Sequence, residues 1–167
     1  MDRDLAAAVV TQTRERLQDL RRRLHVTLLR MTPDDLGWRP DADSNSAGNL
    51  VIHICGNLRQ RFVAGFGGAP DDRDRDAEFA ATGPWTGAGL AAQADATLGA
   101  VDAFLAGLEP DRLTEERVIQ GRTFSLLGVL LATVGHTSEH VGQIIYIAKA
   151  RQGEGFQTLS APLPRHR

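Results

Sequence analysis

The sequence predicts an all-α fold, a bundle of four helices that are each about 20 to 27 residues long. Three observations predict it. Apolar residues recur at helical spacing in four segments, residues that cap or break helices bound each segment, and only one short stretch alternates like a strand. The chain has 167 residues, 42% of them hydrophobic, which is enough for one core. We therefore expect a single domain over residues 1–167 that ends in an irregular tail at 153–167.

The first two helices are predicted at about residues 4–30 and 46–64. Pro33 closes the first helix, and its apolar residues follow the helical period at Leu5, Val9, Leu17, Leu20, Leu24 and Leu28. The second helix follows a linker that is rich in proline, aspartate and serine. Three consecutive residues of this linker can cap the helix, Ser44, Asn45 and Ser46.

A long connection precedes the third predicted helix. Residues 65–87 are rich in glycine, proline and charge, so we expect an irregular segment there. Long loops in compact domains often carry function. Thr86 is placed to cap a helix at about 87–108, and Pro110 ends it.

The fourth helix is predicted at about residues 126–152. The stretch RVIQGRTF, residues 117–124, alternates loosely around Gly121 and predicts a small hairpin before it. Ser125 then caps the helix, and glycines at 153 and 155 stop it.

The fourth helix carries two signs of close packing. The run Leu126 to Val134 is apolar on nearly every side, so the helix is either central in the bundle or covered by another subunit. Gly128, Gly135 and Gly142 recur every seven residues, and such a stripe indicates that another backbone packs closely there. The alternative is that glycine is simply common in this chain, with 17 residues. We expect a homodimer on this basis.

The same helix contains the sequence GHTSEHVGQ, in which His136 and His140 are four residues apart. Two such side chains project in nearly the same direction, with Cβ atoms about 5–6 Å apart, so both rings can bind one metal ion. For this pair alone, metal ligation, acid/base chemistry and a purely structural role remain open.

A polar stripe on the second helix favours the metal site. Asn49, His53, Asn57 and Gln60 share one face of a helix that is otherwise apolar, and such a stripe is usually buried only with a partner. Three neutral imidazoles from two helices, His53, His136 and His140, would form an open site typical of a catalytic ion.

Other candidate residues are expected to lie elsewhere. His25 adjoins an arginine run on the first helix and His166 lies in the tail, so we interpret both as surface residues. Cys55 points to the side of its helix opposite His53, which favours a small core residue over a metal ligand.

Several residues beside the imidazoles are candidates for catalysis and substrate binding. Glu139 lies at the edge of the imidazole face and could act as a general base or orient a ligand ring, with a solvated glutamate as the alternative. Arg73 and Arg75 of the charged segment 71–79 could attract a carboxylate, or the segment could be a solvated loop. The candidate substrate-binding residues are Asn49, Asn57, Arg61, Gln143 and Arg75.

Three segments together carry a resemblance to the DinB-like superfamily: NSAGNLVIHICGNLRQR, RDRDAEF and HTSEHVGQI. The chain resembles a subgroup of unknown function over about residues 10–155. The resemblance implies an up-down-down-up four-helix bundle, often dimeric, in which His53, His136 and His140 hold a divalent metal. Better understood relatives include thiol S-transferases that use bacillithiol or mycothiol and a mycothiol-dependent isomerase.

These observations lead to a functional hypothesis. A divalent metal, for which we favour zinc over nickel, iron or manganese, would make a bound thiol or water nucleophilic toward a small electrophilic molecule. A low-molecular-weight thiol would then be a co-substrate in an S-transferase-like reaction. The alternatives are a non-catalytic metal-binding or interaction bundle and a DNA-associated stress-response protein.

Composition and charge restrict the remaining classes. The net charge is −2 and no aromatic residues interleave with the arginines of the first helix, so nucleic-acid binding is disfavoured. One cysteine cannot form an intrachain disulfide, and neither a signal peptide nor a membrane span is recognisable. We expect a cytoplasmic protein without a membrane partner.

Overall fold

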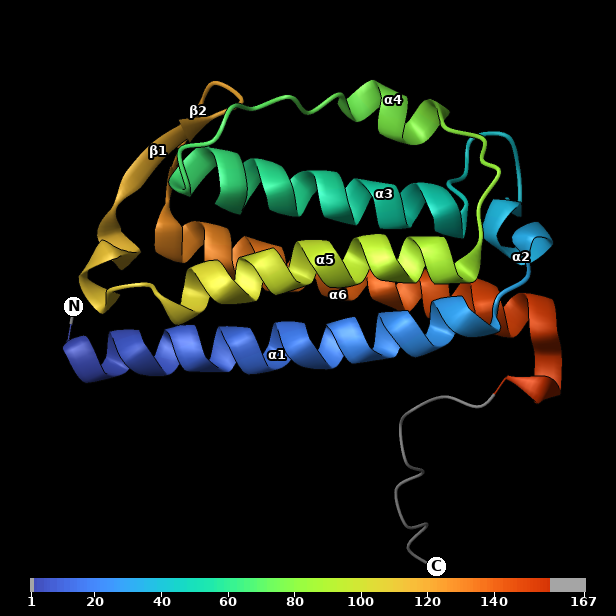
Figure 1. Cartoon of the computed structure of the whole chain (residues 1–167), viewed down its shortest axis with the longest axis horizontal. Coiled ribbons are helices and arrows are strands. Elements are labelled where there is room, and N and C mark those ends of the chain that lie inside the picture. The colour runs from blue at the N-terminus through green and yellow to red at the C-terminus, as the bar shows by residue number, and fades with distance from the viewer. Residues whose placement is uncertain (1, 157–167) are drawn as a thin grey trace, which may run out of the picture.

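Four long helices form the body of the protein, as the sequence predicts (Figure 1). The computed structural model describes residues 2–156. Its elements are α1 (Arg3–Arg30), α2 (Pro33–Gly37), α3 (Ala47–Leu58), the π-helical segment η1 (Arg59–Phe66), α4 (Arg75–Ala80), α5 (Gly87–Ala106), the 3₁₀ turn η2 (Pro110–Thr114), β1 (Glu116–Ile119), β2 (Arg122–Ser125), α6 (Leu126–Gln152) and the 3₁₀ turn η3 (Gly153–Gly155).

The four long helices run in the order up, down, down, up. Helices α3 and α5 both run opposite to α1, and α6 returns in the direction of α1 (Figure 1). Each of α1 and α3 packs against both α5 and α6, so α1 and α3 lie on a diagonal of the bundle. This arrangement places the middle of α3 against the middle of α6, where the histidines lie.

The helix boundaries follow from side-chain caps. Ser46 Oγ accepts from the backbone N–H of Asn49, and the Asn49 side chain accepts from Ser46 N–H in return. Thr86 and Ser125 cap α5 and α6 in the predicted way. Helix α6 ends at Gly153, whose φ of 60° is accessible to glycine at little cost.

The long connection between α3 and α5 contains more structure than the sequence predicts. We expected an irregular segment over residues 65–87, but α4 forms within it, capped by Asp74, and packs along α3 (Figure 1). Glu78 of α4 is 6% exposed, so a charged residue of this segment reaches the interior. The linker before α3 likewise contains the short helix α2, which Thr32 caps.

The predicted hairpin is present. Strands β1 and β2 pair antiparallel, with Ile119 opposite Arg122. The two turn residues, Gln120 and Gly121, both have positive φ, as a tight two-residue hairpin turn requires. The hairpin lies at the end of the bundle where α6 begins (Figure 1).

The predicted close packing of a backbone on the glycine stripe of α6 is absent within the described residues. A Cβ atom added at Gly135 or Gly142 would have no neighbour within 4 Å, and one at Gly128 would meet only the Ser125 hydroxyl. Leu131, on the same helix, is 65% exposed. This face of α6 therefore points outward from the single chain.

Two sequence predictions concern the end of the chain. Residues 153–155 form the turn η3 rather than an irregular segment. The rest of the predicted tail from 157 onward, with His166, lies outside the described residues. Within residues 2–156, no helix is both long enough and apolar enough to cross a membrane.

Asp35 ties the short helix α2 to the end of α6. Its carboxylate accepts hydrogen bonds from Thr32 N–H, Arg151 Nε and Gln152 Nε2, and the residue is 6% exposed. Burial opposes ionisation, yet the hydrogen bonds from Gln152, Thr32 and Arg151 outweigh it and lower the pKa of Asp35 below its usual value of 3.8. Charge at this position thus stabilises the fold.

Replacing Asp35 with asparagine should lower the free energy of unfolding at pH 7 by about 1–2 kcal/mol, because charge-assisted hydrogen bonds are lost. A lowered folded-state pKa gives stabilisation that is present above the unfolded-state pKa, near 3.9, and is lost as the pH falls through the folded-state pKa. Urea unfolding of both proteins from pH 7 to pH 2.5 should therefore show a difference in the free energy of unfolding that disappears below about pH 4. The exposed Asp34→Asn variant is the control. A difference between wild type and Asp35→Asn that stays constant with pH contradicts the prediction.

Candidate metal centre

Three histidine rings converge between α3 and α6. His53 Nε2 lies 3.0 Å from His136 Nε2, and His140 Nε2 lies 3.1 Å from the same atom. One ring nitrogen from each residue lies within 4.8 Å of the other two. His53 is buried, while His136 and His140 are partly buried. The residues predicted from helical spacing are therefore brought together.

The outer ring nitrogens are held by acceptors. His53 Nδ1 lies 2.9 Å from Glu78 Oε2, and His140 Nδ1 lies 2.8 Å from Gln143 Oε1. An oxygen that can only accept requires Nδ1 to carry the hydrogen. These two rings therefore direct the lone pair of Nε2 toward the centre of the cluster.

The convergent nitrogens fit a metal cation. His136 has one hydrogen at most on Nε2, so it cannot make a good hydrogen bond to both neighbouring lone pairs. Three nitrogens at 2.0–2.1 Å from one tetrahedral ion would be about 3.3 Å apart, close to the separations here. The donor set of three neutral imidazoles thus suits zinc or a similar divalent ion.

Two of the three imidazoles have a lowered pKa. Burial, together with the neighbouring His140 and His53, lowers the pKa of His136 to about 4. Burial also lowers the pKa of His53, although Glu78 opposes the change. Metal ligation needs the neutral ring, and the lowered pKa values of His53 and His136 favour that form at pH 7.

A buried ion pair supports His53 from behind. Arg73 Nε and Nη2 donate to the two oxygens of Glu78 at 2.8 and 2.9 Å, and both side chains are less than 8% exposed. Burial opposes ionisation of Glu78, but hydrogen bonds from Arg73 and His53 outweigh it and hold the pKa of the carboxyl below 4.5. A carboxylate that fixes the orientation of a ligating imidazole is a common feature of metal sites.

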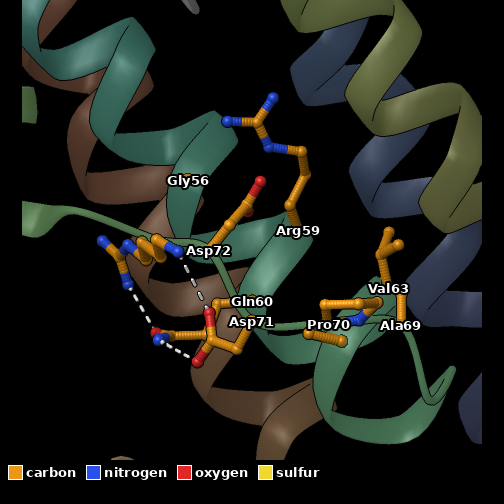
Figure 2. A pocket seen from close by; sticks show the side chains of 10 residues that line it. Gly56, Arg59, Gln60, Val63, Ala69, Pro70, Asp71 and Asp72 are labelled. Atoms are coloured by element: carbon orange, nitrogen blue, oxygen red, sulfur yellow. Dashed lines mark hydrogen bonds between the residues drawn. The ribbon is translucent and has the colours of Figure 1, made fainter.

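Gln60 extends this network toward the surface. Arg73 Nη1 donates to Gln60 Oε1 at 2.8 Å, and Gln60 Nε2 donates to Asp71 at 2.9 Å. These residues line a cavity of about 290 Å³ on the outer side of α3, where Figure 2 shows Gln60 and Asp71 turned toward each other. The polar stripe of the second predicted helix therefore has its partner in the 65–87 connection.

Gly56 makes the approach of Glu78 possible. It lies one turn after His53, and a Cβ atom at this position would overlap the Glu78 carboxylate. Sequence reasoning missed Glu78, since a single glutamate in a charged segment gives no periodic signal. The sequence did contain one indication: the polar stripe of the second predicted helix needs a buried partner, and the charged segment that follows this helix could supply one.

The predicted substrate-binding residues occupy different surroundings. Asn49 is fully buried, and its amide donates to three backbone carbonyls of residues 78–81, while Arg39 donates to its oxygen. Gln143 is exposed and bonds His140. Arg75 is exposed, with its guanidinium 4.9 Å from the Phe79 ring.

Asn57 and Arg61 have buried polar atoms without a hydrogen-bond partner, namely Asn57 Oδ1 and Arg61 Nη1. Arg61 stacks on Phe124 at 5.5 Å and lies close enough to help lower the pKa of His136. Buried Thr133 and Thr137, each three residues before a ligand histidine, also have unpartnered hydroxyls. Unpartnered polar atoms in such a position indicate space for water or a ligand.

The remaining candidates have defined positions. Glu139 is exposed and lines a cavity of about 630 Å³ that also borders His140. Cys55 is fully buried, and burial raises the pKa of its thiol to about 11, as suits a core residue. His25 is partly exposed, with Nδ1 2.6 Å from Asp95 on α5.

Comparison with known families decides the relationship. The family model described as "Protein of unknown function (DUF1572)" matches residues 4–165. The chain belongs to this family. Comparison with curated proteins gives no match for this DUF1572 protein.

Two crystal structures share the fold of this DUF1572 protein. A DinB-like protein from Bacillus cereus ATCC 10987 superposes with a TM-score of 0.66 at 14% identity, covering 86% of this chain and 91% of its own. The DinB-like protein YjoA from Bacillus subtilis gives 0.65 at 19% identity, covering 91% of this chain and 99% of its own. The predicted DinB-like fold is thereby confirmed.

Replacing Gly56 with alanine should displace Glu78 and weaken the metal centre. We expect the free energy of unfolding to fall by about 1–3 kcal/mol from overpacking and zinc affinity to fall about 10-fold or more, because His53 loses its orienting carboxylate. Urea unfolding and competition with a zinc chelator measure the two effects.

Gly99→Ala on α5 is the matched control. Its added Cβ would make only an ordinary contact, 3.7 Å from Arg21 Nη1, so it should leave zinc affinity unchanged and stabilise the helix by up to about 1 kcal/mol. Equal zinc affinities in the two variants would show that Glu78 does not support the site.

Proposed function

We propose that this protein is a metal-dependent enzyme that acts on a small electrophilic molecule, most closely as a thiol S-transferase. The observation that carries this proposal is the convergence of three imidazole nitrogens beside a cavity. His53, His136 and His140 would hold one divalent ion, for which we favour zinc over nickel, iron or manganese. A bound zinc ion supplies Lewis-acid chemistry that lowers the pKa of a thiol or of water.

The ligand count favours a catalytic site over a structural one. Within residues 2–156, no cysteine or carboxylate joins the three histidines as a fourth ligand. Structural zinc sites are closed by four protein ligands, whereas catalytic sites keep one position for water or substrate. A non-catalytic metal-binding or interaction bundle is the competing function, and the three-ligand set argues against it.

The chain's own groups have distinct proposed roles. Glu139, beside His140, would accept the proton of the nucleophile as a general base. Asn57 and Arg61 would bind the polar or anionic part of the reacting molecules, since their partnerless buried atoms lie on α3, which carries His53, and on η1, which continues it. Gln143 holds His140, and Arg75 stays a predicted contact to substrate. Asn49, which is fully buried with its amide bonded within the protein, would support the segment beside the site rather than touch substrate.

Nucleic-acid binding has less support. Arginines of α1 pair with acidic residues, Arg14 with Asp102 and Arg21 with Asp95, so their charge is compensated on the protein itself. Counterion release by unpaired basic groups supplies most of the affinity for nucleic acid. We propose instead an enzyme that acts on small molecules in the cytoplasm, with a low-molecular-weight thiol as co-substrate.

Metal content tests the proposal directly. Untagged wild-type protein should carry about one equivalent of a divalent metal, and His140→Ala should lose at least about nine tenths of it, since one of three ligands is removed. Plasma mass spectrometry on protein that has met no nickel resin measures this. His25→Ala, which lies outside the cluster, should retain the metal.

Transfer of a thiol to an electrophile is then assayed on the same samples. The rate should follow metal content across wild type, His140→Ala and His25→Ala. If wild-type protein neither contains metal nor takes it up from zinc, manganese, iron or nickel, the proposed function is wrong.

We also infer that two copies of the chain associate through the outward face of α6. Leu131 is 65% exposed on this face, and the neighbouring Gly135 leaves room for a close backbone. Small residues that permit close approach and exposed leucines are typical of helix–helix interfaces. A second copy supplies the same surface by two-fold symmetry.

Replacing Leu131 with glutamate should disrupt this dimer, because it places a charge in the apolar contact. Sedimentation velocity should give a dimer for wild type and a monomer for Leu131→Glu. Leu5→Glu on α1, where Leu5 is 58% exposed, is the control and should stay dimeric. A monomeric wild type at about 100 μM excludes the inferred interface.

A further inference from the structure

The cavity beside His140 has a composition that restricts its ligand. It is about 630 Å³ in volume and is enclosed by α6 on one side and by the linker between α2 and α3 on the other. We propose that it binds the substrate and selects a small molecule with a ring-sized apolar body and a positively charged amino group. This inference rests on the proposed function, which makes the histidine cluster the reacting centre.

The walls of the cavity are apolar and aromatic. Trp38 and Tyr146 contribute rings, and Leu50 and Ile147 contribute buried aliphatic side chains, 3% and 7% exposed. A volume of a few hundred Å³ with such a lining is typical of sites for small organic molecules. Tyr146 is 73% exposed in the single chain, so its ring has one face to offer to a ligand.

The charges on the walls have one sign. Asp43 of the linker and Glu139 of α6 both line the cavity, and no lysine or arginine is among the described residues that line it. Two carboxylates and two aromatic rings attract an ammonium group by charge and by cation–π contact, and they repel a carboxylate. The cavity therefore discriminates by charge as well as by shape.

A cation beside the cavity is already paired with a carboxylate. The Arg151 guanidinium lies 5.7 Å from the Trp38 ring and donates to the Asp35 carboxylate at 3.2 Å. Asp35 is almost completely buried, so this pair compensates the arginine charge away from the cavity. Arg151 consequently does not provide an anion site for the ligand.

The positions of the two carboxylates suggest how a ligand is oriented in the cavity. Glu139 precedes His140, whose Nε2 faces the metal centre, and the exposed Gln143 holds the opposite side of that ring. A ligand whose amino group lies near Asp43, on the linker wall, extends toward His140 on the α6 wall, where Glu139 would act as the general base.

Three ligands of similar shape and different charge test the selection: 2-phenylethylamine, 2-phenylethanol and phenylacetate. Dissociation constants are measured by NMR titration at pH 7 and low salt, on metal-free and on zinc-loaded protein. In the metal-free protein, the amine should bind about fivefold more tightly than the alcohol, and phenylacetate should bind more weakly than either. Added salt should reduce the preference.

Variants locate the effect in the cavity. The double variant Asp43→Asn with Glu139→Gln should reduce the preference for the amine over the alcohol to less than about twofold, and leave the affinity for the alcohol unchanged. Trp38→Leu should weaken all three ligands. Glu15→Gln, on the far side of α1, is the control and should keep the wild-type order.

Two outcomes overturn the inference. One is phenylacetate binding as tightly as the amine to metal-free protein, and the other is a preference for the amine that survives in the double variant. Zinc uptake, measured separately on the same samples, distinguishes this failure from that of the proposed function. Protein that binds zinc but shows no preference refutes the cavity's selectivity alone, whereas a preference without zinc uptake refutes only the metal-dependent reaction.

Discussion

The site depends on the contacts that the buried carboxylate of Glu78 makes with Arg73 and His53. This carboxylate lies between the guanidinium of Arg73 and the ring of His53, so one buried negative charge balances a buried cation and orients an imidazole of the candidate metal centre. Removing either partner would leave an uncompensated charge in the interior, which is strongly destabilising. Since Arg73 and Glu78 belong to the segment between α3 and α5, this connection is part of the site and anchors α4 to α3. The contact between α4 and α3 requires a glycine at position 56, because the side chain of a larger residue would overlap the Glu78 carboxylate.

The four long helices and the three convergent histidines could be predicted because periodic patterns encode them. Helical spacing fixes which side chains share a face, and His53, His136 and His140 needed only two helices to pack for their rings to meet. Caps such as Ser125 and Thr86 act through hydrogen bonds within three residues, so they too are readable from sequence.

The role of Glu78 could not be predicted in the same way, since it depends on a tertiary contact 25 residues away from His53. Helix α4 has only six residues and owes its stability to packing on α3, which no local pattern reveals. The glycine stripe of α6 illustrates the opposite case. Its pattern indicates close packing, yet a Cβ atom at Gly135 or Gly142 would have no neighbour within 4 Å among the described residues, because a repeat shows which residues share a helix face and not what covers that face.

The environment of Cys55 has a practical consequence for chemistry with electrophiles. It is the single cysteine of the chain, it is fully buried, and its raised pKa keeps it as an unreactive thiol at neutral pH. Under the proposed function, this burial would protect the protein from alkylation by an electrophilic substrate. The rate at which a thiol reagent modifies Cys55 would also report local opening of the bundle, since the reagent can reach this residue only in molecules in which α3 has transiently separated from its neighbours.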